Sequence, residues 1–236
     1  MSTKNLTENG LELNERPDSS FSRRKFLGFV GAGSAAIATA SLVASCKDND
    51  KPSNGGVNLG SGDVGILNYA YALEQLEAAF YVRVISSLYS GVTATEQAFL
   101  TDIRDHEVAH RNFFKAAISA AGATPLRDLE VDFSTIDFGN KASVLGTAKA
   151  FEDLGVTAYN GAGKLLQSAA YLTIAGKIVS VEARHAAMIA DLISNGTFAD
   201  TTDANGLDMA RTPAQVLDIA KTYVKTKLDA SNLPTS

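Results

Sequence analysis

The 236-residue chain contains a single cysteine, Cys46, so it has no second thiol for an intrachain disulfide. A zinc or iron-sulfur site built from cysteines within one chain is excluded for the same reason, because such sites need several thiolates. Any metal chemistry in this protein must therefore use oxygen and imidazole ligands.

The chain also lacks a concentration of positive charge. It has 21 Lys and Arg against 26 Asp and Glu, which gives a formal net charge of −5, and its basic residues are scattered beyond the first fifty positions. Without a basic stripe there is little to neutralise a phosphate backbone, so we expect no nucleic-acid partner. Its 45% apolar and 20% charged residues are typical of a globular domain with a core.

Half-buried strands are missing as well, because only residues 129–133 alternate briefly between apolar and polar. From Asp63 onward the apolar residues instead recur at helical spacing. This periodicity predicts helices at 63–89, at 93–121 with a capping box at its start, at 141–169 and at 173–194, and a last amphipathic helix at 212–228. The sequence therefore predicts an all-α fold.

A loop of unusual length, residues 123–140, separates the second and third predicted helices. A helix of about 27 residues is roughly 40 Å long, and a connection of about 18 residues can span roughly 60 Å, so the loop can run the full length of a bundle. Two tight helix pairs joined by one long crossover form a recognised four-helix bundle topology. We expect the bundle at 63–200, followed by a loop and C-terminal helix at 201–236.

The N-terminal segment has the layout of a secretory signal. Arg23 and Arg24 precede a charge-free stretch, rich in Gly and Ala, that runs to Ser45. The paired arginines resemble the twin-arginine export motif, although Gly28 stands where that motif usually has Lys. By this resemblance residues 1–45 are a signal peptide and the protein is loaded with cofactor before export. The alternatives are a chance basic pair and an uncleaved membrane anchor.

Cys46 follows a run of small residues, 42–45, that resembles a lipoprotein box. In such a box the cysteine is lipidated and becomes the mature N-terminus. The alternative, a small buried side chain, does not suit the polar residues 47–56 that follow. We therefore expect a flexible tether at 46–62 and an exported protein of the cell envelope or periplasm, anchored to a membrane by the lipid at Cys46.

The predicted helices contain a repeated set of carboxylates, imidazoles and phenols. The first half of the domain has Glu74 with Tyr81 and Glu107 with His110, and the second half has Glu152 with Tyr159 and Glu182 with His185. In each half a Glu-x6-Tyr helix is followed by a Glu-x-x-His helix. A single Glu-x-x-His is more often part of a solvated face than of a site, but two of them in this order are hard to obtain by chance.

The spacing places these groups together. Positions i and i+3 share a helix face, so each Glu-x-x-His can offer a carboxylate and an imidazole to one metal ion. Seven residues are two turns, which puts each tyrosine on the face of its glutamate, and the distances from the turns give all groups nearly the same height. One Glu from each of two helices plus a Glu-x-x-His from each of the other two is the pattern of bundles that hold two iron or manganese ions.

Charge supports metal occupancy. Four buried glutamates would place four negative charges at close range, and each unpaired buried charge costs several kcal/mol. Two divalent ions would cancel these charges, whereas without metal most of the carboxylates would have to be protonated. Carboxylates and imidazoles without thiolate suit iron or manganese, so we predict two iron ions, with manganese as the alternative.

Two neighbouring residues could be confused with ligands. His106 lies one turn before His110, and we interpret it as a surface residue or as a neighbour of the ligands. Glu77 could replace Glu74, but it has no tyrosine two turns later.

Stretches 71–81 and 151–159 resemble the ferritin-like superfamily, especially its bacterial and plant branch that includes desiccation-related proteins, and the resemblance covers roughly residues 63–200. It implies metal ligation, terminal or bridging, by Glu74 and Glu152, together with ligation by Glu107, His110, Glu182 and His185. It also implies that Tyr81 and Tyr159 hydrogen-bond ligand carboxylates.

Two functions follow from this reading. The first is a di-iron protein that oxidises iron or reacts with dioxygen or peroxide. The second is a structural or stress-protective helical bundle in which metal only stabilises the fold. The lipid and tether favour a monomer or small oligomer over a storage cage, and the sequence identifies no substrate, catalytic residue or oligomeric state.

Overall fold

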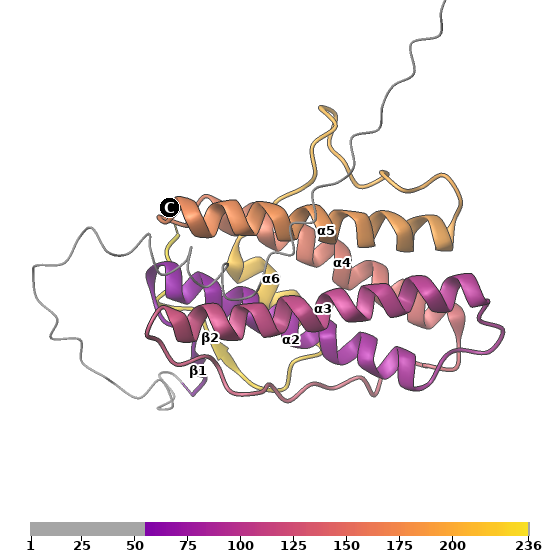
Figure 1. The fold of residues 1–236 in the computed structure, drawn as a ribbon, viewed down its shortest axis with the longest axis horizontal. Coiled ribbons are helices and arrows are strands. Elements are labelled where there is room, and N and C mark those ends of the chain that lie inside the picture. Colours follow the sequence, from indigo (N-terminus) through magenta and orange to yellow (C-terminus); the bar gives the residue numbers. More distant parts are fainter. Residues whose placement is uncertain (1–54, 236) are drawn as a thin grey trace, which may run out of the picture. The chain divides into compact units, whose positions relative to one another are not determined.

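The computed structural model describes residues 55–235, so the predicted signal and Cys46 lie outside the described residues. The elements are β1 (Val57–Asn58), α2 (Gly62–Ser86), α3 (Ala94–Ala120), α4 (Lys141–Gly163), α5 (Ala169–Ile193), α6 (Pro213–Ala220) and β2 (Leu228–Asp229). The all-α prediction is confirmed, because α2 to α5 form a four-helix bundle and α6 is the additional C-terminal helix (Figure 1). None of the helices in this part of the chain is long and apolar enough to cross a membrane.

The turn between α4 and α5 differs from the prediction. Helix α4 ends at Gly163 rather than at residue 169, and α5 begins at Ala169 rather than at residue 173. The carboxylate of Asp63, at the start of α2, accepts hydrogen bonds from the backbone N–H groups of Gln167 at 2.8 Å and Ser168 at 2.9 Å. This contact comes from another helix, so the periodicity of the local sequence could not indicate it.

The predicted helix at 212–228 is wrong beyond Ala220. There the chain leaves the helix, the backbone N–H of Lys225 donates to the carbonyl of Glu130 at 2.8 Å, and β2 pairs in parallel with β1. These partners lie about a hundred or more positions earlier in the sequence. Pairing with distant backbone therefore replaces the helical hydrogen bonds that the amphipathic pattern predicted.

Part of the predicted tether at 46–62 is packed against the domain. Leu59 is fully buried, and the Asn68 side-chain amide donates to its carbonyl at 3.1 Å. Among the described residues, the packed part of the chain thus begins before residue 63, where the bundle was expected to start.

The crossover between α3 and α4 runs along α2 for most of that helix (Figure 1). Asn68 Oδ1 accepts a hydrogen bond from the backbone N–H of Leu126 at 3.2 Å, and two turns later Gln75 Oε1 accepts one from Leu129 at 2.8 Å. Buried backbone groups need such partners, so these two amides hold the loop against the helix. The sequence had indicated a connection able to span the bundle, and the observed loop does so.

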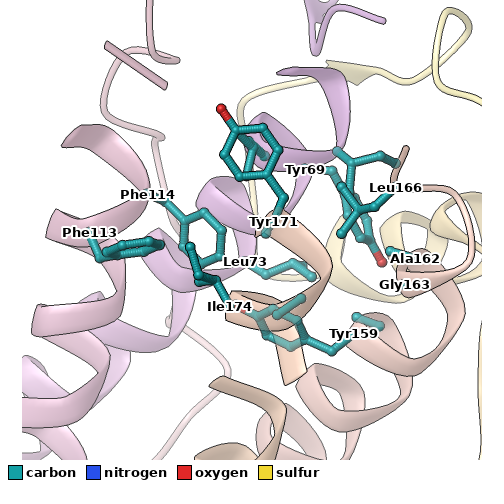
Figure 2. A pocket seen from close by; sticks show the side chains of 15 residues that line it. Tyr69, Leu73, Phe113, Phe114, Tyr159, Ala162, Gly163, Leu166, Tyr171 and Ile174 are labelled. Atoms are coloured by element: carbon teal, nitrogen blue, oxygen red, sulfur yellow. The ribbon is translucent and has the colours of Figure 1, made fainter. Parts of the chain in front are cut away.

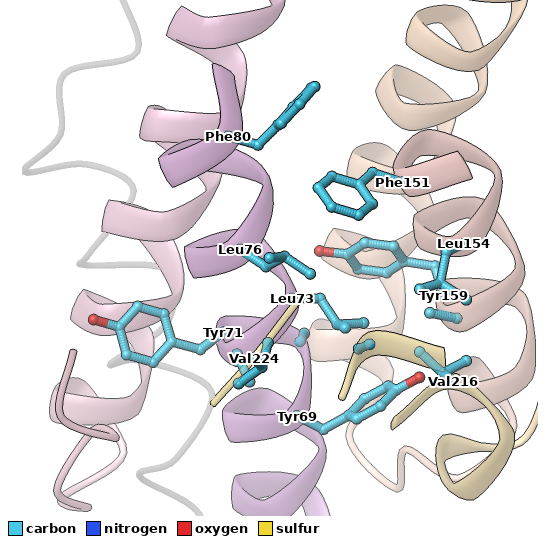
Figure 3. Close-up of a cluster of buried hydrophobic side chains, with 14 of the residues drawn as sticks. Tyr69, Tyr71, Leu73, Leu76, Phe80, Phe151, Leu154, Tyr159, Val216 and Val224 are labelled. Atoms are coloured by element: carbon cyan, nitrogen blue, oxygen red, sulfur yellow. The ribbon is translucent and has the colours of Figure 1, made fainter. Parts of the chain in front are cut away.

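Helix α2 is buried on nearly all sides, because α3, α4, the crossover and the C-terminal segment surround it. Figure 3 shows the resulting core between α2 and α4, where Phe80 faces Phe151 and Leu73 lies nearer to Tyr159. Val224 of the C-terminal segment lies beside α2 in the same core. A helix that is buried all round holds its polar side chains away from water. The glutamates of α2 therefore lie in the interior.

The C-terminal segment approaches α4 closely at Gly161, and this contact gives a test of the packing. The backbone N–H of Arg211 donates to the carbonyl of Thr157 at 2.9 Å, and a Cβ at Gly161 would lie 1.8 Å from the Arg211 carbonyl oxygen. We expect Gly161→Ala to lower the free energy of unfolding by about 1–3 kcal/mol, measured by chemical denaturation. Gly146→Ala on the same helix is the control, because no atom lies within 4 Å of its Cβ position, and it should stabilise by up to about 1 kcal/mol. Equal stability of the two variants would mean that the segment does not rest on α4 in solution.

Candidate metal centre

The six predicted ligand residues lie together in the interior of the bundle. They come from all four long helices: Glu74 from α2, Glu107 and His110 from α3, Glu152 from α4, and Glu182 and His185 from α5. The four glutamate side chains have no exposed surface, and the side chains of His110 and His185 are 13% and 6% exposed. The glutamates therefore lie on the interior side of the site, and the histidines lie on the side nearer the surface.

The first donor group surrounds the Nδ1 atom of His110. This atom lies 2.8 Å from Glu182 Oε1 and 3.5 Å from Glu74 Oε2. Glu107 Oε2 completes the group at 3.8 Å. The donor atoms of these four residues all lie within 4.8 Å of one another, a spread that a single metal ion can span.

The second donor group surrounds the Nδ1 atom of His185. Glu107 Oε1 lies 2.9 Å away, Glu152 Oε2 lies 3.4 Å away, and Glu182 Oε2 lies 3.6 Å away. Glu107 and Glu182 belong to both groups, each with one oxygen in either group. Glu74 and Glu152 each belong to one group only, each with its Oε2.

Apart from the histidine–glutamate contacts within the groups, the donor atoms of both groups have no hydrogen-bond partner. Among the described residues, ten buried side-chain nitrogen or oxygen atoms lack a well-aligned hydrogen bond, and eight of the ten belong to this site. The eight are Oε2 of Glu74 and of Glu152, both oxygens of Glu107 and of Glu182, and Nδ1 of His110 and of His185. Buried polar atoms are normally paired by well-aligned hydrogen bonds, so eight atoms in one place without them, four in each group, fit two bound cations.

Two tyrosines hold the outer oxygens of the terminal glutamates. The hydroxyl of Tyr159 donates to Glu74 Oε1, and that of Tyr81 donates to Glu152 Oε1. Each bond crosses between α2 and α4, and it leaves only Oε2 of that glutamate facing the donor group. Burial, followed by the charge of the bonded carboxylate, raises the pKa of both phenols well above its ordinary value, so both remain donors.

The histidines substitute for cations in the protein without metal. Burial alone would lower the pKa of His110 and His185, but hydrogen bonds to the surrounding glutamates raise both to about 12. Burial would raise the pKa of Glu107, but hydrogen bonds from the same two histidines lower it to about 2. Each imidazole thus carries a proton on the nitrogen that faces its donor group.

The positive charge near Glu74 and Glu152 is too small to keep both carboxylates ionised. Burial raises the pKa of Glu74 well above its ordinary value and that of Glu152 to about 8, and the hydrogen bonds from the histidines offset this only in part. Two imidazolium ions therefore do not suffice to ionise the whole cluster. Divalent cations, which carry twice the charge, would.

His106 supplies no atom to either donor group and contacts His185 from behind. Its Nδ1 lies 2.9 Å from Nε2 of His185, the nitrogen that faces away from the carboxylates. Since His185 is protonated on both nitrogens without metal, Nε2–H donates and His106 accepts, which fixes the orientation of the His185 ring. In the first half His106 lies four residues before His110. The equivalent position in the second half, four residues before His185, is Val181, so the second half has no such histidine. The contact joins α3 to α5, so the sequence could not identify it.

Glu77 is a fifth buried glutamate, 4% exposed, but it belongs to neither donor group. Its Oε1 lies 3.0 Å from the position that a Cβ would occupy at Gly155 on α4. Gly155 has the same position in the second half that Glu77 has in the first, three residues after Glu152 and Glu74 respectively. Because Gly155 has no side chain, the side chain of Glu77 can occupy the space beside it. Burial, and then the charges of the ligand-set glutamates, raise the pKa of Glu77 well above its ordinary value.

Comparison with known families gives one match. Residues 62–195, more than half of the chain, match a family described as a ferritin-like domain. The matched range contains α2 to α5 and all six residues of the two donor groups, and it ends before α6. No curated protein matches the chain.

Proposed function

Because this chain belongs to the ferritin-like domain family, we propose that its bundle binds two iron ions and serves to oxidise ferrous iron with dioxygen or peroxide. The observation that carries the proposal is the set of eight buried donor atoms whose only close polar contacts are with one another, divided equally between two groups. Manganese is the alternative metal, since the same ligand types suit it.

The proposed ligand assignment follows the two donor groups. Glu74 and His110 would hold one ion, Glu152 and His185 the other, and Glu107 and Glu182 would bridge both. Each ion would have four protein donors, and an oxidant could complete its ligand set. A pair of iron ions in such a site supplies two electrons by passing from the ferrous to the ferric state.

The remaining contacts prepare the site for this chemistry. Tyr81 and Tyr159 fix the rotation of the two terminal carboxylates, and His106 fixes the ring of His185. Such outer hydrogen bonds orient metal ligands and typically change metal affinity about 10–100-fold when they are lost. The complete burial of the glutamates keeps bulk water away from the donor groups.

We further propose that the protein acts outside the cytoplasm, anchored at the cell envelope by a lipid on Cys46. The support is the paired Arg23 and Arg24 and the lipoprotein-type run before Cys46, all of which precede the described residues. Export in a folded state would allow the metal centre to be loaded beforehand. We also propose that the protein belongs to the desiccation-related branch of the family.

A structural or stress-protective role is the second candidate, and one observation favours it. Nδ1 of His110 and of His185 lie 2.8 and 2.9 Å from glutamate oxygens, and these contacts raise the pKa of both histidines, so that their imidazolium forms neutralise part of the carboxylate cluster without metal. The bundle can therefore fold before metal binds, and a purely structural use of the domain does not require redox chemistry.

Metal titration of the full chain distinguishes the two roles. Protein produced with its signal intact, stripped of metal and titrated anaerobically with ferrous iron, should bind two ions per chain and then develop a ferric absorbance band when dioxygen or peroxide is added. Zinc is the control: it should bind in the same number and raise the melting temperature, but give no such band. Less than one iron per chain would contradict the metal site. Binding of two ions without any oxidation would contradict the oxidation of iron and support the structural role.

A further inference from the structure

An apolar cavity lies between the helices at the end of the bundle where α2 and α5 begin. Its volume is about 30 Å³, and its walls come from all four long helices. Figure 2 shows Phe113 and Phe114 of α3 close to Tyr171 and Ile174 of α5, with Leu73 of α2 beside Phe114. Almost all of the surface that faces the cavity is carbon.

The cavity leads from the surface toward the metal centre. Phe113, Tyr171 and Ile174 are half-buried and form its mouth, whereas Phe114 and Tyr159 are buried and form its floor. The side chain of Tyr159 lines the cavity while its hydroxyl bonds Oε1 of Glu74, whose other oxygen belongs to the first donor group, so Tyr159 links the cavity wall to that group.

Size and polarity restrict what the cavity can hold. Apolar cavities stay dry and take up small apolar molecules, and a volume of about 30 Å³ exceeds the ~10–15 Å³ needed by one water-sized molecule. It is far below the ~150 Å³ cavity that holds benzene. A diatomic apolar gas is small enough for this volume and apolar enough for these walls.

We propose that this cavity binds dioxygen and delivers it to the metal centre from the end of the bundle. The proposal rests on the proposed function, because dioxygen is needed here only if the site holds ferrous iron. In the balanced reaction two ferrous ions give two electrons to one dioxygen, two protons are taken from solvent, and two ferric ions and one hydrogen peroxide result. Peroxide is polar, so it has no reason to use an apolar passage.

Xenon binding tests the cavity without any metal. Metal-free protein should bind xenon, detected by xenon NMR, with shifts of the Leu73 and Phe114 resonances. Ala162→Leu, which places a larger side chain into the cavity wall, should weaken this binding about tenfold. Ala150→Leu is the matched control, since it makes the same change at an exposed position of the same helix and should bind xenon as the wild type does. If Ala162→Leu does not fold, Ala70→Val makes a smaller change on the opposite wall.

Oxidation kinetics test the delivery. In stopped-flow experiments on iron-loaded protein, the cavity-filling variant should be oxidised about tenfold more slowly by dioxygen and at the wild-type rate by peroxide. Wild-type rates with both oxidants, or no xenon binding by the wild type, would overturn the proposal. Tight binding of a longer alkyl or aromatic probe would also overturn it, because the cavity would then serve a larger ligand. A chain that binds xenon but no iron would instead refute the proposed function.

Discussion

Replacing Glu107 by glutamine will abolish binding of both metal ions, whereas replacing Glu74 by glutamine will weaken only one. Glu107 places one oxygen in each donor group, and Glu74 places one oxygen in the group of His110 alone. Glutamine keeps the size of the side chain but removes its negative charge and one acceptor oxygen. The loss in affinity should exceed the roughly 10–100-fold that an outer hydrogen-bond partner contributes.

Metal content and melting temperature measure this difference. A ligand present at 100 times its dissociation constant stabilises a protein by about 2.7 kcal/mol, and for a domain of this size each kcal/mol moves the melting temperature by roughly 2–4 °C. Each occupied site should thus add roughly 5–10 °C. We expect Glu107→Gln to show no metal-dependent rise, and Glu74→Gln to show about half of the wild-type rise.

Glu77→Gln is the control for both variants. Glu77 lies one turn from Glu74 on the same helix and is also buried, but it belongs to neither donor group. The variant should therefore keep both ions, and it should be no less stable without metal, because it removes a buried carboxyl group. A loss of metal as large as that of Glu74→Gln would show that the two groups are assigned incorrectly.

The topology of the bundle was predictable because it depends on features that lie close together in the sequence. Helical periodicity, the capping box at Thr93 and Glu96, and the length of the crossover are all local, and the structure confirms the bundle with its single crossover. The contacts that Asp63 makes with the turn before α5, and the pairing of β2 with β1, join distant segments. No local pattern encodes these contacts, which is why the helix ends near them were predicted incorrectly.

The residues of the candidate site were predictable because its two halves repeat. Helix periodicity fixes which residues share a face, but the rotation of each side chain decides which oxygen bridges and which accepts a tyrosine. The crossing of the Tyr81 and Tyr159 bonds between α2 and α4 depends on how closely those helices approach. That distance follows from packing throughout the core, not from the spacing of any motif.

The two halves of the site are not equivalent, and the differences lie beside the ligands. Glu77 of the first half lies beside Gly155, its equivalent in the second half. His106 hydrogen-bonds the ring of His185, whereas Val181, the equivalent of His106, cannot hydrogen-bond the ring of His110. A ring held by a second hydrogen bond is better oriented for a metal ion than one without it. We therefore expect the ion beside His185 to bind more tightly than the ion beside His110.

The stability of the metal-free protein will fall as the pH rises from about 6 to 9, and that of the metal-loaded protein will not. In the metal-free fold the pKa values of His110 and His185 are raised to about 12, against about 6.5 for a free histidine. The folded state then binds more protons than the unfolded chain, so this stabilisation is complete below about pH 6.5 and is lost progressively between about pH 6.5 and 12. Glu152, with a pKa raised to about 8, acts in the same direction, and the lowered pKa of Glu107 has no effect in this range.

Bound metal reverses this dependence because it must displace the imidazole protons, and displacement becomes easier as the pH rises. The difference in melting temperature between iron-loaded and chelator-treated protein should therefore widen steadily from pH 6 to about pH 8.5. Calorimetric titration in buffers of different ionisation enthalpy should also show release of at least two protons when both sites fill, one from each histidine. Metal-free protein that becomes more stable with rising pH would mean that the histidines are not held as imidazolium ions among the glutamates, and a constant difference in melting temperature would mean that metal does not replace their protons.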